Sequence, residues 1–266
     1  MKTRAITGIV FVAVMIASTL LGAYVYSIFF TLLSTWCLYE FYGIVSSEDR
    51  APNKGIGIAL ALVLFALGSL ISMNILGEKF LALIIPFVSV TYIISLFQKR
   101  TFPFNDIAYT FLGIAYVTLP FFLFSKLGFI QGDFNYVLPL GFLILLWTND
   151  TGAYLAGRSF GKRKLFERIS PKKTWEGFFG GLILAIVAAV NLEKYFGYLS
   201  LWQWISIAAI ISIVGTLGDL VESMLKRSLH VKDSGNILPG HGGFLDRFDG
   251  LLLAAPMVYV FLILIN

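Results

Sequence analysis

The chain has 266 residues, of which 58% are hydrophobic and 13% are charged, and its mean hydropathy is +0.84. Soluble domains carry roughly 25% charged residues, so this composition excludes an ordinary water-soluble protein and favours a membrane protein. The net charge of +5 is explained first by basic loops on one side of a membrane and then by an anionic ligand, so no nucleic acid is expected as a partner. The single cysteine, Cys37, excludes an internal disulfide and a cysteine-based metal site.

Nine apolar segments follow one another along the chain, and each approaches the ~20 residues that a helix needs to cross the hydrocarbon. Their approximate ranges are 5–22, 26–46, 55–73, 79–97, 106–124, 136–156, 175–192, 201–225 and 250–265. Backbone groups in lipid must be hydrogen-bonded within their own segment, which favours helices, and the short alternating segments of a β-barrel are not seen. We therefore predict an all-α, polytopic transmembrane helical bundle with about nine spans.

The first segment follows the basic residues Lys2 and Arg4, which is also the pattern of a cleaved signal peptide. No clear cleavage site separates this segment from the second one. We therefore expect a retained first helix, which forms a tight hairpin with the second helix.

The Lys and Arg residues are distributed unevenly over the loops between the nine segments. Seventeen of the 20 lie on the side of the N-terminus, and only Lys79, Lys126 and Lys194 lie on the opposite side. Because basic residues are enriched in cytoplasmic loops, the N-terminus is predicted to be cytoplasmic and the C-terminus to lie outside. The regions 158–173 and 226–247 hold more basic residues than orientation requires, so they need a further explanation.

The first of these two regions follows Asp150, an acid within the sixth apolar segment. An acid in a membrane span usually faces a polar cavity. The sequence SPKKTWEG reads as the start of the next helix, in which Thr174 is the cap and Glu176 lies at the positive end. A helix N-terminus beside Lys172 and Lys173 predicts an anion site, and the alternative is an ordinary cap with lysines at the membrane surface.

The eighth apolar segment carries polar residues on one face. Asp219, Glu222, Ser223 and Lys226 are spaced i, i+3, i+4 and i+7, which places them together on a helix. Glu222 can pair with Lys226, which is a purely structural role. Asp219 has no basic neighbour in the sequence, so we interpret it as a metal ligand or a substrate contact.

A loop rich in Gly, Pro and basic residues connects the last two segments. Backbone N–H groups near glycine approach phosphates closely, and Lys and Arg neutralise them. Asp246 and Asp249 end this loop three positions apart, so on a helix they would share a face near the end of the segment that carries Asp219. Three carboxylates without a histidine cluster favour Mg²⁺, which carboxylates and substrate phosphates hold jointly. The alternative is a helix cap in which Arg247 pairs with Asp246 or Asp249.

The stretch from Ser223 to Asp249 resembles the signature of the phosphatidate cytidylyltransferases, also called CDP-diacylglycerol synthases. The matching residues are Ser223, Leu225, Lys226, Arg227, Lys232, Asp233, His241, Gly242, Gly243, Phe244, Asp246, Arg247, Phe248 and Asp249. The segments FGK at 160–162 and SPKKTWEG at 170–177 also resemble this family. Because the resemblance covers about 147–250, we expect N-terminal transmembrane helices at 1–135 and a C-terminal catalytic transmembrane region with cytoplasmic loops at 136–266.

The resemblance implies Mg²⁺-dependent transfer of the cytidylyl group of CTP to phosphatidic acid, which gives CDP-diacylglycerol and pyrophosphate. The implied catalytic residues are Asp219, Asp246, Lys226 and Arg227, and the implied metal ligands are Asp219, Asp246 and Asp249. The implied substrate-binding residues are Lys172, Lys173, Ser223, Lys232, His241, Gly242, Gly243 and Arg247. The expected setting is a bacterial inner (plasma) membrane with the active site facing the cytoplasm. The expected partners are CTP, phosphatidic acid, the lipid bilayer and, in a homodimer, a second copy of the chain.

Two other functions are alternatives from the sequence alone. A CTP-dependent lipid kinase would transfer the γ-phosphoryl group and release CDP, with no pyrophosphate. A transporter for an anionic solute would also use acids within the membrane and a basic vestibule, but transporters commonly carry repeated halves, and no internal repeat is seen here. The sequence leaves open the acyl-chain preference and the role of Glu40 in the second segment.

Overall fold

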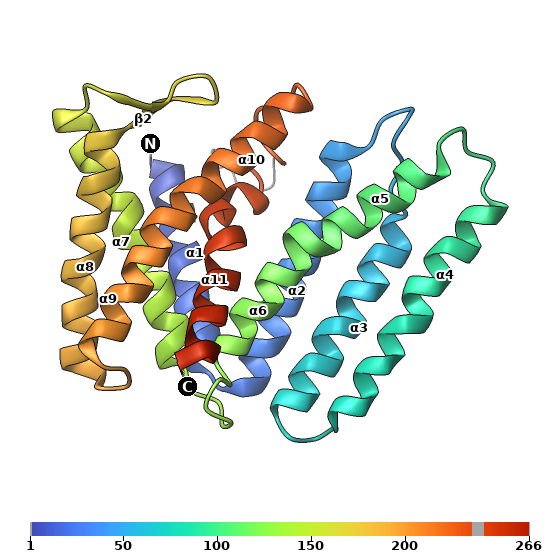
Figure 1. The fold of residues 1–266 in the computed structure, drawn as a ribbon, viewed down its shortest axis with the longest axis horizontal. Helices are drawn as coiled ribbons and strands as arrows, with labels where there is room; N and C mark the ends of the chain where they lie inside the picture. Colours follow the sequence, from blue (N-terminus) through green and yellow to red (C-terminus); the bar gives the residue numbers. More distant parts are fainter. Residues whose placement is uncertain (1, 236–241, 266) are drawn as a thin grey trace. The chain divides into compact units, whose positions relative to one another are not determined.

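The computed structural model describes residues 2–235 and 242–265, and the described residues are mostly helical. They form two compact units, of which the first comprises Met1–Phe134 with Val231–Arg247 and the second comprises Asn135–His230 with Phe248–Asn266. Figure 1 follows the chain through its helices from α1 to α11. The residues Val231–Arg247, which we expect in the C-terminal region, belong to the first unit. The catalytic role that we expect for the C-terminal region stays a prediction.

The first unit consists of helices joined by short loops. Its elements are α1 (Lys2–Leu20), α2 (Ala23–Val45), α3 (Lys54–Ser72), η1 (Glu78–Leu83), α4 (Ile84–Phe97), α5 (Pro103–Gly113), η2 (Ile114–Thr118), α6 (Leu119–Leu127) and η4 (Leu245–Arg247). Only Leu21 and Gly22 separate α1 from α2, as the expected hairpin requires. The element η2 is a π-helical turn, so α5, η2 and α6 form one continuous helical run.

Helix α2 is the centre of the first unit, where it packs against α1, α3, α5 and α6. Two fully buried tyrosines on α2 donate their hydroxyl groups to backbone carbonyls of this run. Tyr26 Oη lies 3.0 Å from the carbonyl oxygen of Phe124, and Tyr42 Oη lies 2.7 Å from that of Thr110. These bonds satisfy hydroxyl groups that have no access to water. The ring of Tyr26 also packs against those of Phe30 and Phe124, so the core combines aromatic packing with hydrogen bonds between helices.

The second unit contains the helices α7 to α11 and one β-hairpin. Its elements are α7 (Val137–Phe160), β1 (Lys164–Phe166), β2 (Ser170–Thr174), α8 (Trp175–Phe196), α9 (Leu201–Ile210), η3 (Ile211–Gly215), α10 (Thr216–Ser228) and α11 (Asp249–Ile265). Figure 1 shows α7 beside α8, with the hairpin β1–β2 over their ends. The π-helical turn η3 joins α9 to α10, and α11 packs against η3 and α10.

Small residues allow α7 and α8 to approach closely. A β-carbon on Gly181 would lie 2.7 Å from the carbonyl oxygen of Asn149, and one on Gly177 would lie 2.8 Å from that of Ala153. Both distances are shorter than real Cβ contacts allow. Close backbone approach over small residues is a common way for helices to associate in lipid, where the hydrophobic effect does not drive association.

Six helical runs in the described part are long and apolar enough to cross a membrane. They are Ala23–Val45, Lys54–Ser72, Glu78–Phe97, Pro103–Leu127, Trp175–Phe196 and Leu201–Ser228. The other three expected segments correspond to α1, α11 and α7. The apolar helices Thr7–Leu20 and Asp249–Ile265 are shorter, and the second half of α7 carries Asn149 and Asp150. The predicted count of about nine spans is therefore not confirmed, although a largely helical membrane protein is.

The basic loop between α7 and α8 contains structure that the sequence did not predict. It forms an antiparallel hairpin in which Lys164 pairs with Thr174 and Phe166 pairs with Ser170. Strands of three and five residues are too short to show a clear alternating pattern. The predicted cap is confirmed, because Thr174 Oγ1 accepts a hydrogen bond from the N–H of Gly177 at 3.2 Å.

Candidate functional site

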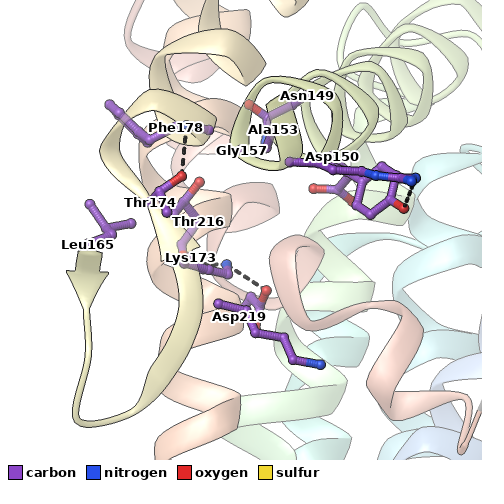
Figure 2. Close-up of a pocket in the computed structure, with 14 residues that line it drawn as sticks. Asn149, Asp150, Ala153, Gly157, Leu165, Lys173, Thr174, Phe178, Thr216 and Asp219 are labelled. Carbon is purple, nitrogen blue, oxygen red and sulfur yellow. Dashed lines mark hydrogen bonds and ion pairs between the residues drawn. The ribbon is translucent and has the colours of Figure 1, made fainter. Parts of the chain in front are cut away.

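A pocket of about 390 Å³ lies within the second unit (Figure 2). It is lined by Asn149, Asp150, Ala153, Tyr154, Gly157, Arg158, Leu165, Lys172, Lys173, Thr174, Gly177, Phe178, Thr216 and Asp219. The sequence led us to expect that Asp150 faces a polar cavity and that Lys172 and Lys173 lie beside a helix N-terminus. All three line this pocket, with Thr174 at the start of α8 next to them.

The shortest polar contact in the pocket joins strand β2 to helix α10. Lys173 Nζ lies 2.5 Å from Asp219 Oδ2, and it lies 3.4 Å from the carbonyl oxygen of Thr216 (Figure 2). The side chains of Lys173 and Asp219 are 25% and 34% exposed, so an incoming ligand can reach both. Asp219 therefore has a basic partner that is distant in the sequence. Its predicted role as a metal ligand stays a prediction.

Two further carboxylates lie near this ion pair. Asp150 on α7 and Asp249 at the start of α11 interact electrostatically with Asp219 and with Lys173. Asp249 Oδ1 also accepts a hydrogen bond from the N–H of Gly250 at 2.7 Å. Four elements of the second unit thus bring three carboxylates and one ammonium group into the same region.

The donor atoms of this region are of the kind that Mg²⁺ prefers. Across residues 2–235 and 242–265, no group of three His, Cys, Asp or Glu side chains is placed as a ready-made metal site. Mg²⁺ commonly uses only one or two protein carboxylates and takes its other oxygen ligands from substrate phosphates and water. Asp219 with one neighbouring carboxylate fits such a partial site.

The predicted ligands Asp246 and Asp249 do not lie on one helix. Asp246 belongs to the 3-10 turn η4 of the first unit, whereas Asp249 begins α11 of the second unit. The expectation of a shared helical face is wrong, because the chain leaves η4 before α11 begins. The ligand set Asp219, Asp246 and Asp249 stays a prediction.

The polar face of α10 has the arrangement that the sequence suggested. Lys226 Nζ lies 2.9 Å from Glu222 Oε2, and their side chains are 15% and 1% exposed. A buried carboxylate is costly without a partner, so Lys226 compensates the charge of Glu222. Ser223 Oγ donates a hydrogen bond to Asp219 Oδ1 at 3.3 Å. The predicted pairing of Glu222 with Lys226 is confirmed. Contact of Lys226 or Ser223 with substrate stays a prediction.

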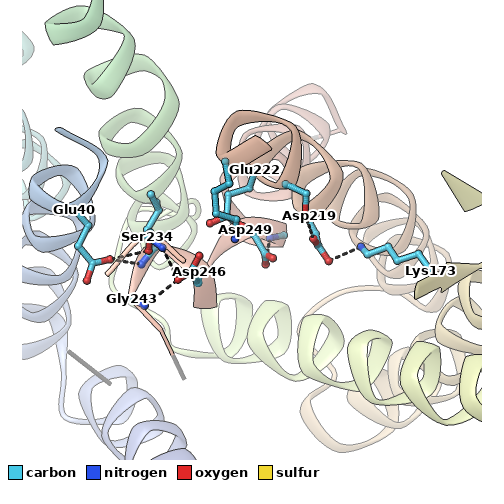
Figure 3. Close-up of polar contacts among 12 residues, drawn as sticks. Glu40, Lys173, Asp219, Glu222, Ser234, Gly243, Asp246 and Asp249 are labelled. Atoms are coloured by element: carbon cyan, nitrogen blue, oxygen red, sulfur yellow. Dashed lines mark hydrogen bonds and ion pairs between the residues drawn. The ribbon is translucent and has the colours of Figure 1, made fainter. Parts of the chain in front are cut away.

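The loop before α11 is anchored within the first unit by two carboxylates (Figure 3). Asp246 Oδ2 accepts hydrogen bonds from the N–H groups of Ser234 and Gly243, each at 2.9 Å. Glu40 on α2 accepts further bonds from Ser234 and from the backbone after Gly243. Gly242 has a φ of +79°, which favours glycine.

The remaining predicted binding residues are placed as follows. Arg227 lies in the last turn of α10 in the second unit, and Lys232 and Arg247 belong to the first unit; all three are exposed. His241 lies outside the described residues. Their contacts with substrate stay predictions.

Comparison with known proteins places the chain in a family. Residues 2–265 match the model of the cytidylyltransferase family. The chain belongs to the cytidylyltransferase family. The match covers the N-terminal helices as well as the region whose motifs resemble the family.

Full-length relatives within the cytidylyltransferase family carry a common name. The chain is 37% identical over 268 residues to the phosphatidate cytidylyltransferase of Staphylococcus haemolyticus, and 99% of each chain is covered. It is 35% identical over 265 residues to the protein of that name from Staphylococcus epidermidis, and 34% identical to that from Staphylococcus aureus, again with 99% coverage of each chain. These relatives and the apolar helices fit a bacterial membrane protein.

Sequence reasoning missed several residues of the pocket. Asn149 and Thr216 line it without having been predicted, and so do Tyr154 and Arg158. The polar run TND at 148–150, which interrupts the apolar segment, is a signal for Asn149. Thr216 gives no such signal, because a threonine in a membrane helix commonly bonds its own backbone.

Proposed function

We propose that this chain transfers the cytidylyl group of CTP to phosphatidic acid and releases pyrophosphate, with CDP-diacylglycerol as the lipid product. The observation that carries the proposal is the pocket of the second unit, where Lys172 and Lys173 adjoin the carboxylates Asp150 and Asp219. Cations suit a polyphosphate, and carboxylates suit the metal that accompanies it. Full-length similarity to proteins named phosphatidate cytidylyltransferase supports the same substrates.

The chemistry requires two anions to approach one another. The lipid phosphate is already an anion near neutral pH, so it needs no strong general base. Lys172 and Lys173 bind phosphate oxygens, and their charge favours the alignment of the lipid phosphate with the α-phosphorus of CTP. Lys226, Arg227 and Lys232 are proposed as further phosphate contacts.

Bound Mg²⁺ supplies charge neutralisation for the phosphates of CTP and of the departing pyrophosphate. Asp219 is proposed as its main ligand, with Asp246 and Asp249 as the others, and Asp150 is added because it faces the same pocket. When the phosphates arrive, Lys173 exchanges its bond with Asp219 for a bond with substrate. Before substrate binds, the ion pair between Lys173 and Asp219 keeps both side chains oriented.

The proposed setting is the cytoplasmic face of a bacterial inner (plasma) membrane. The distribution of Lys and Arg over the loops supports a cytoplasmic N-terminus and nine spans. In this arrangement α1, α7 and α11 cross the membrane together with the six runs that are long and apolar enough to do so. CTP is a cytoplasmic nucleotide, so a pocket on that face has access to it. The expected homodimer stays a prediction.

The test uses the full-length chain reconstituted in nanodiscs that contain phosphatidic acid. CTP labelled on its α-phosphorus should transfer label to a lipid product, and one pyrophosphate should appear per labelled lipid. Lipid product labelled only from γ-labelled CTP, with CDP as the released nucleotide, would instead show a kinase. Uptake of a labelled anion into proteoliposomes without either product would show a transporter.

A further inference from the structure

We infer that Glu40, on the second helix of the first unit, is a positioning residue for the signature segment Gly242–Arg247. Its two carboxylate oxygens receive four hydrogen bonds (Figure 3). Oε1 accepts from Trp36 Nε1 at 3.2 Å and from the N–H of Phe244 at 3.1 Å. Oε2 accepts from Ser234 Oγ at 3.2 Å and from the N–H of Leu245 at 2.9 Å. Three of these four donors belong to the loop that precedes α11.

The contacts of Glu40 suit a carboxylate and no neutral side chain of the same shape. Glu40 is 6% exposed, so water does not replace a lost partner. An ionised carboxyl group accepts about four hydrogen bonds and donates none, which matches the four donors that surround it. An amide at this position keeps one acceptor oxygen and turns an NH₂ group toward two N–H or O–H donors. Buried donors left without an acceptor are expensive.

Asp246 acts with Glu40 at the same loop. Ser234 is bound by both carboxylates, since its hydroxyl donates to Glu40 and its N–H donates to Asp246. Asp246 Oδ2 also accepts from the N–H of Gly243, so it ties the two ends of the loop together. Glu40 fixes the described residues Ser234, Phe244 and Leu245 to α2. A proposed metal ligand, Asp246, is thus held in a segment whose position depends on Glu40.

Apolar contacts and the absence of a side chain at Gly243 complete this anchor. The ring of Phe244 lies 6.4 Å from that of Phe11 and 6.5 Å, edge-on, from that of Trp36. A β-carbon on Gly243 would collide with Ser234 Oγ and lie 2.5 Å from Glu40 Oε2. In this structure, therefore, Gly243 provides the room for close approach to Glu40. Its predicted contact with nucleotide stays a separate prediction.

Asp106 of the same unit offers a matched comparison. It is 3% exposed, accepts a hydrogen bond from the N–H of Ala51 at 2.6 Å and pairs with Arg100 at 3.0 Å. Like Glu40, it is a buried acid that holds a loop by its backbone. Unlike Glu40, it contacts no residue of the signature segment. A purely structural role predicts the same consequences for both acids, whereas a positioning role predicts a catalytic defect for Glu40 alone.

The experiment compares Glu40→Gln with Asp106→Asn in the full-length chain in nanodiscs. Hydrogen–deuterium exchange is followed in peptides that cover the signature segment, and kcat is measured well below the Tm of each variant. For Glu40→Gln, exchange in that segment should accelerate by about tenfold or more, because its amides lose their acceptors. Its kcat should fall by about tenfold or more, since misplacement of a catalytic segment is costly. For Asp106→Asn, the exchange rate in the signature segment and kcat should both stay within about twofold of their values in the unchanged chain, while the Tm falls.

Two results overturn the proposal: unchanged exchange in the signature segment of Glu40→Gln, or equal losses of kcat in both variants. If Glu40→Gln does not accumulate in the membrane, Glu40→Asp and Ser234→Ala replace it. Each should change exchange and kcat in the same direction by a smaller factor, and no change in either variant overturns the proposal. The catalytic readout rests on the proposed function. If the unchanged chain makes no product from CTP, that function fails, and exchange alone decides whether Glu40 anchors the segment.

Discussion

Replacement of Lys173 by glutamine tests the charge arrangement of the pocket directly. The pocket lining carries three cations, Arg158, Lys172 and Lys173, and two carboxylates, Asp150 and Asp219. Glutamine at Lys173 leaves equal numbers of positive and negative groups in the lining, so the pocket loses its net attraction for a polyphosphate. The substitution also leaves Asp219 without the ammonium group that lies 2.5 Å away.

The expected size of the effect follows from these contacts. A hydrogen bond to a charged group contributes about 1.5–3 kcal/mol, which corresponds to roughly 10- to 150-fold in kcat/KM. The Lys173–Asp219 pair is partly exposed, so its loss should cost at most about 1 kcal/mol of folding stability. The substitution should therefore lower kcat/KM by at least about tenfold while the free energy of unfolding changes little.

The assay measures kcat/KM for CTP with Lys173→Gln, Lys173→Arg and Lys164→Gln in nanodiscs. Lys164 lies on β1 of the same hairpin but does not line the pocket, so Lys164→Gln controls for the lost charge. Arginine should retain part of the activity because it keeps the charge, although its geometry differs. The reasoning is refuted if Lys173→Gln and Lys164→Gln have the same kcat/KM.

Three further predictions concern the metal and the framework. Asp246→Asn keeps an oxygen that can accept hydrogen bonds from Ser234 and Gly243, so hydrogen–deuterium exchange in the loop should stay close to that of the unchanged chain. Its kcat should fall by about 100-fold, because a metal ligand is lost. Near-normal turnover would remove Asp246 from the proposed metal site. EDTA should abolish turnover and added Mg²⁺ should restore it, and full activity after exhaustive chelation would contradict a metal requirement. Gly177→Val should force α8 away from Ala153 and lower the Tm by several degrees, as followed by thermal unfolding; an unchanged Tm would show that the helices can separate at little cost.

The sequence predicted those parts of the structure that depend on local pattern. The apolar segments, the Thr174 cap and the Glu222–Lys226 pair all involve neighbours along the chain or along a helix. The hairpin β1–β2 was missed because its strands are too short for a pattern. The span count was not confirmed, since the apolar parts of α1 and α11 are short and the second half of α7 carries the polar residues Asn149 and Asp150.

The contacts that define the site are those that sequence reasoning could not supply. The pair Lys173–Asp219 joins two elements that the fold alone brings together. Glu40 meets Ser234 across 194 positions, so its role was open until the loop could be placed on α2. Motif resemblance predicts candidate residues, but it does not distinguish a residue that would contact substrate from one that holds the chain in place.

The π-helical turn η3, between α9 and α10, restricts which insertions and deletions this part of the chain tolerates in evolution. An α-helix advances by about 100° per residue, so a π-helical turn rotates everything that follows it relative to an uninterrupted helix. Trp204 before the turn is buried, and Thr216 and Asp219 after it face the pocket. Loss or gain of one residue in Ile211–Gly215 would turn both polar side chains away while leaving the composition almost unchanged. Selection on this segment should therefore act on residue number more strictly than on residue identity.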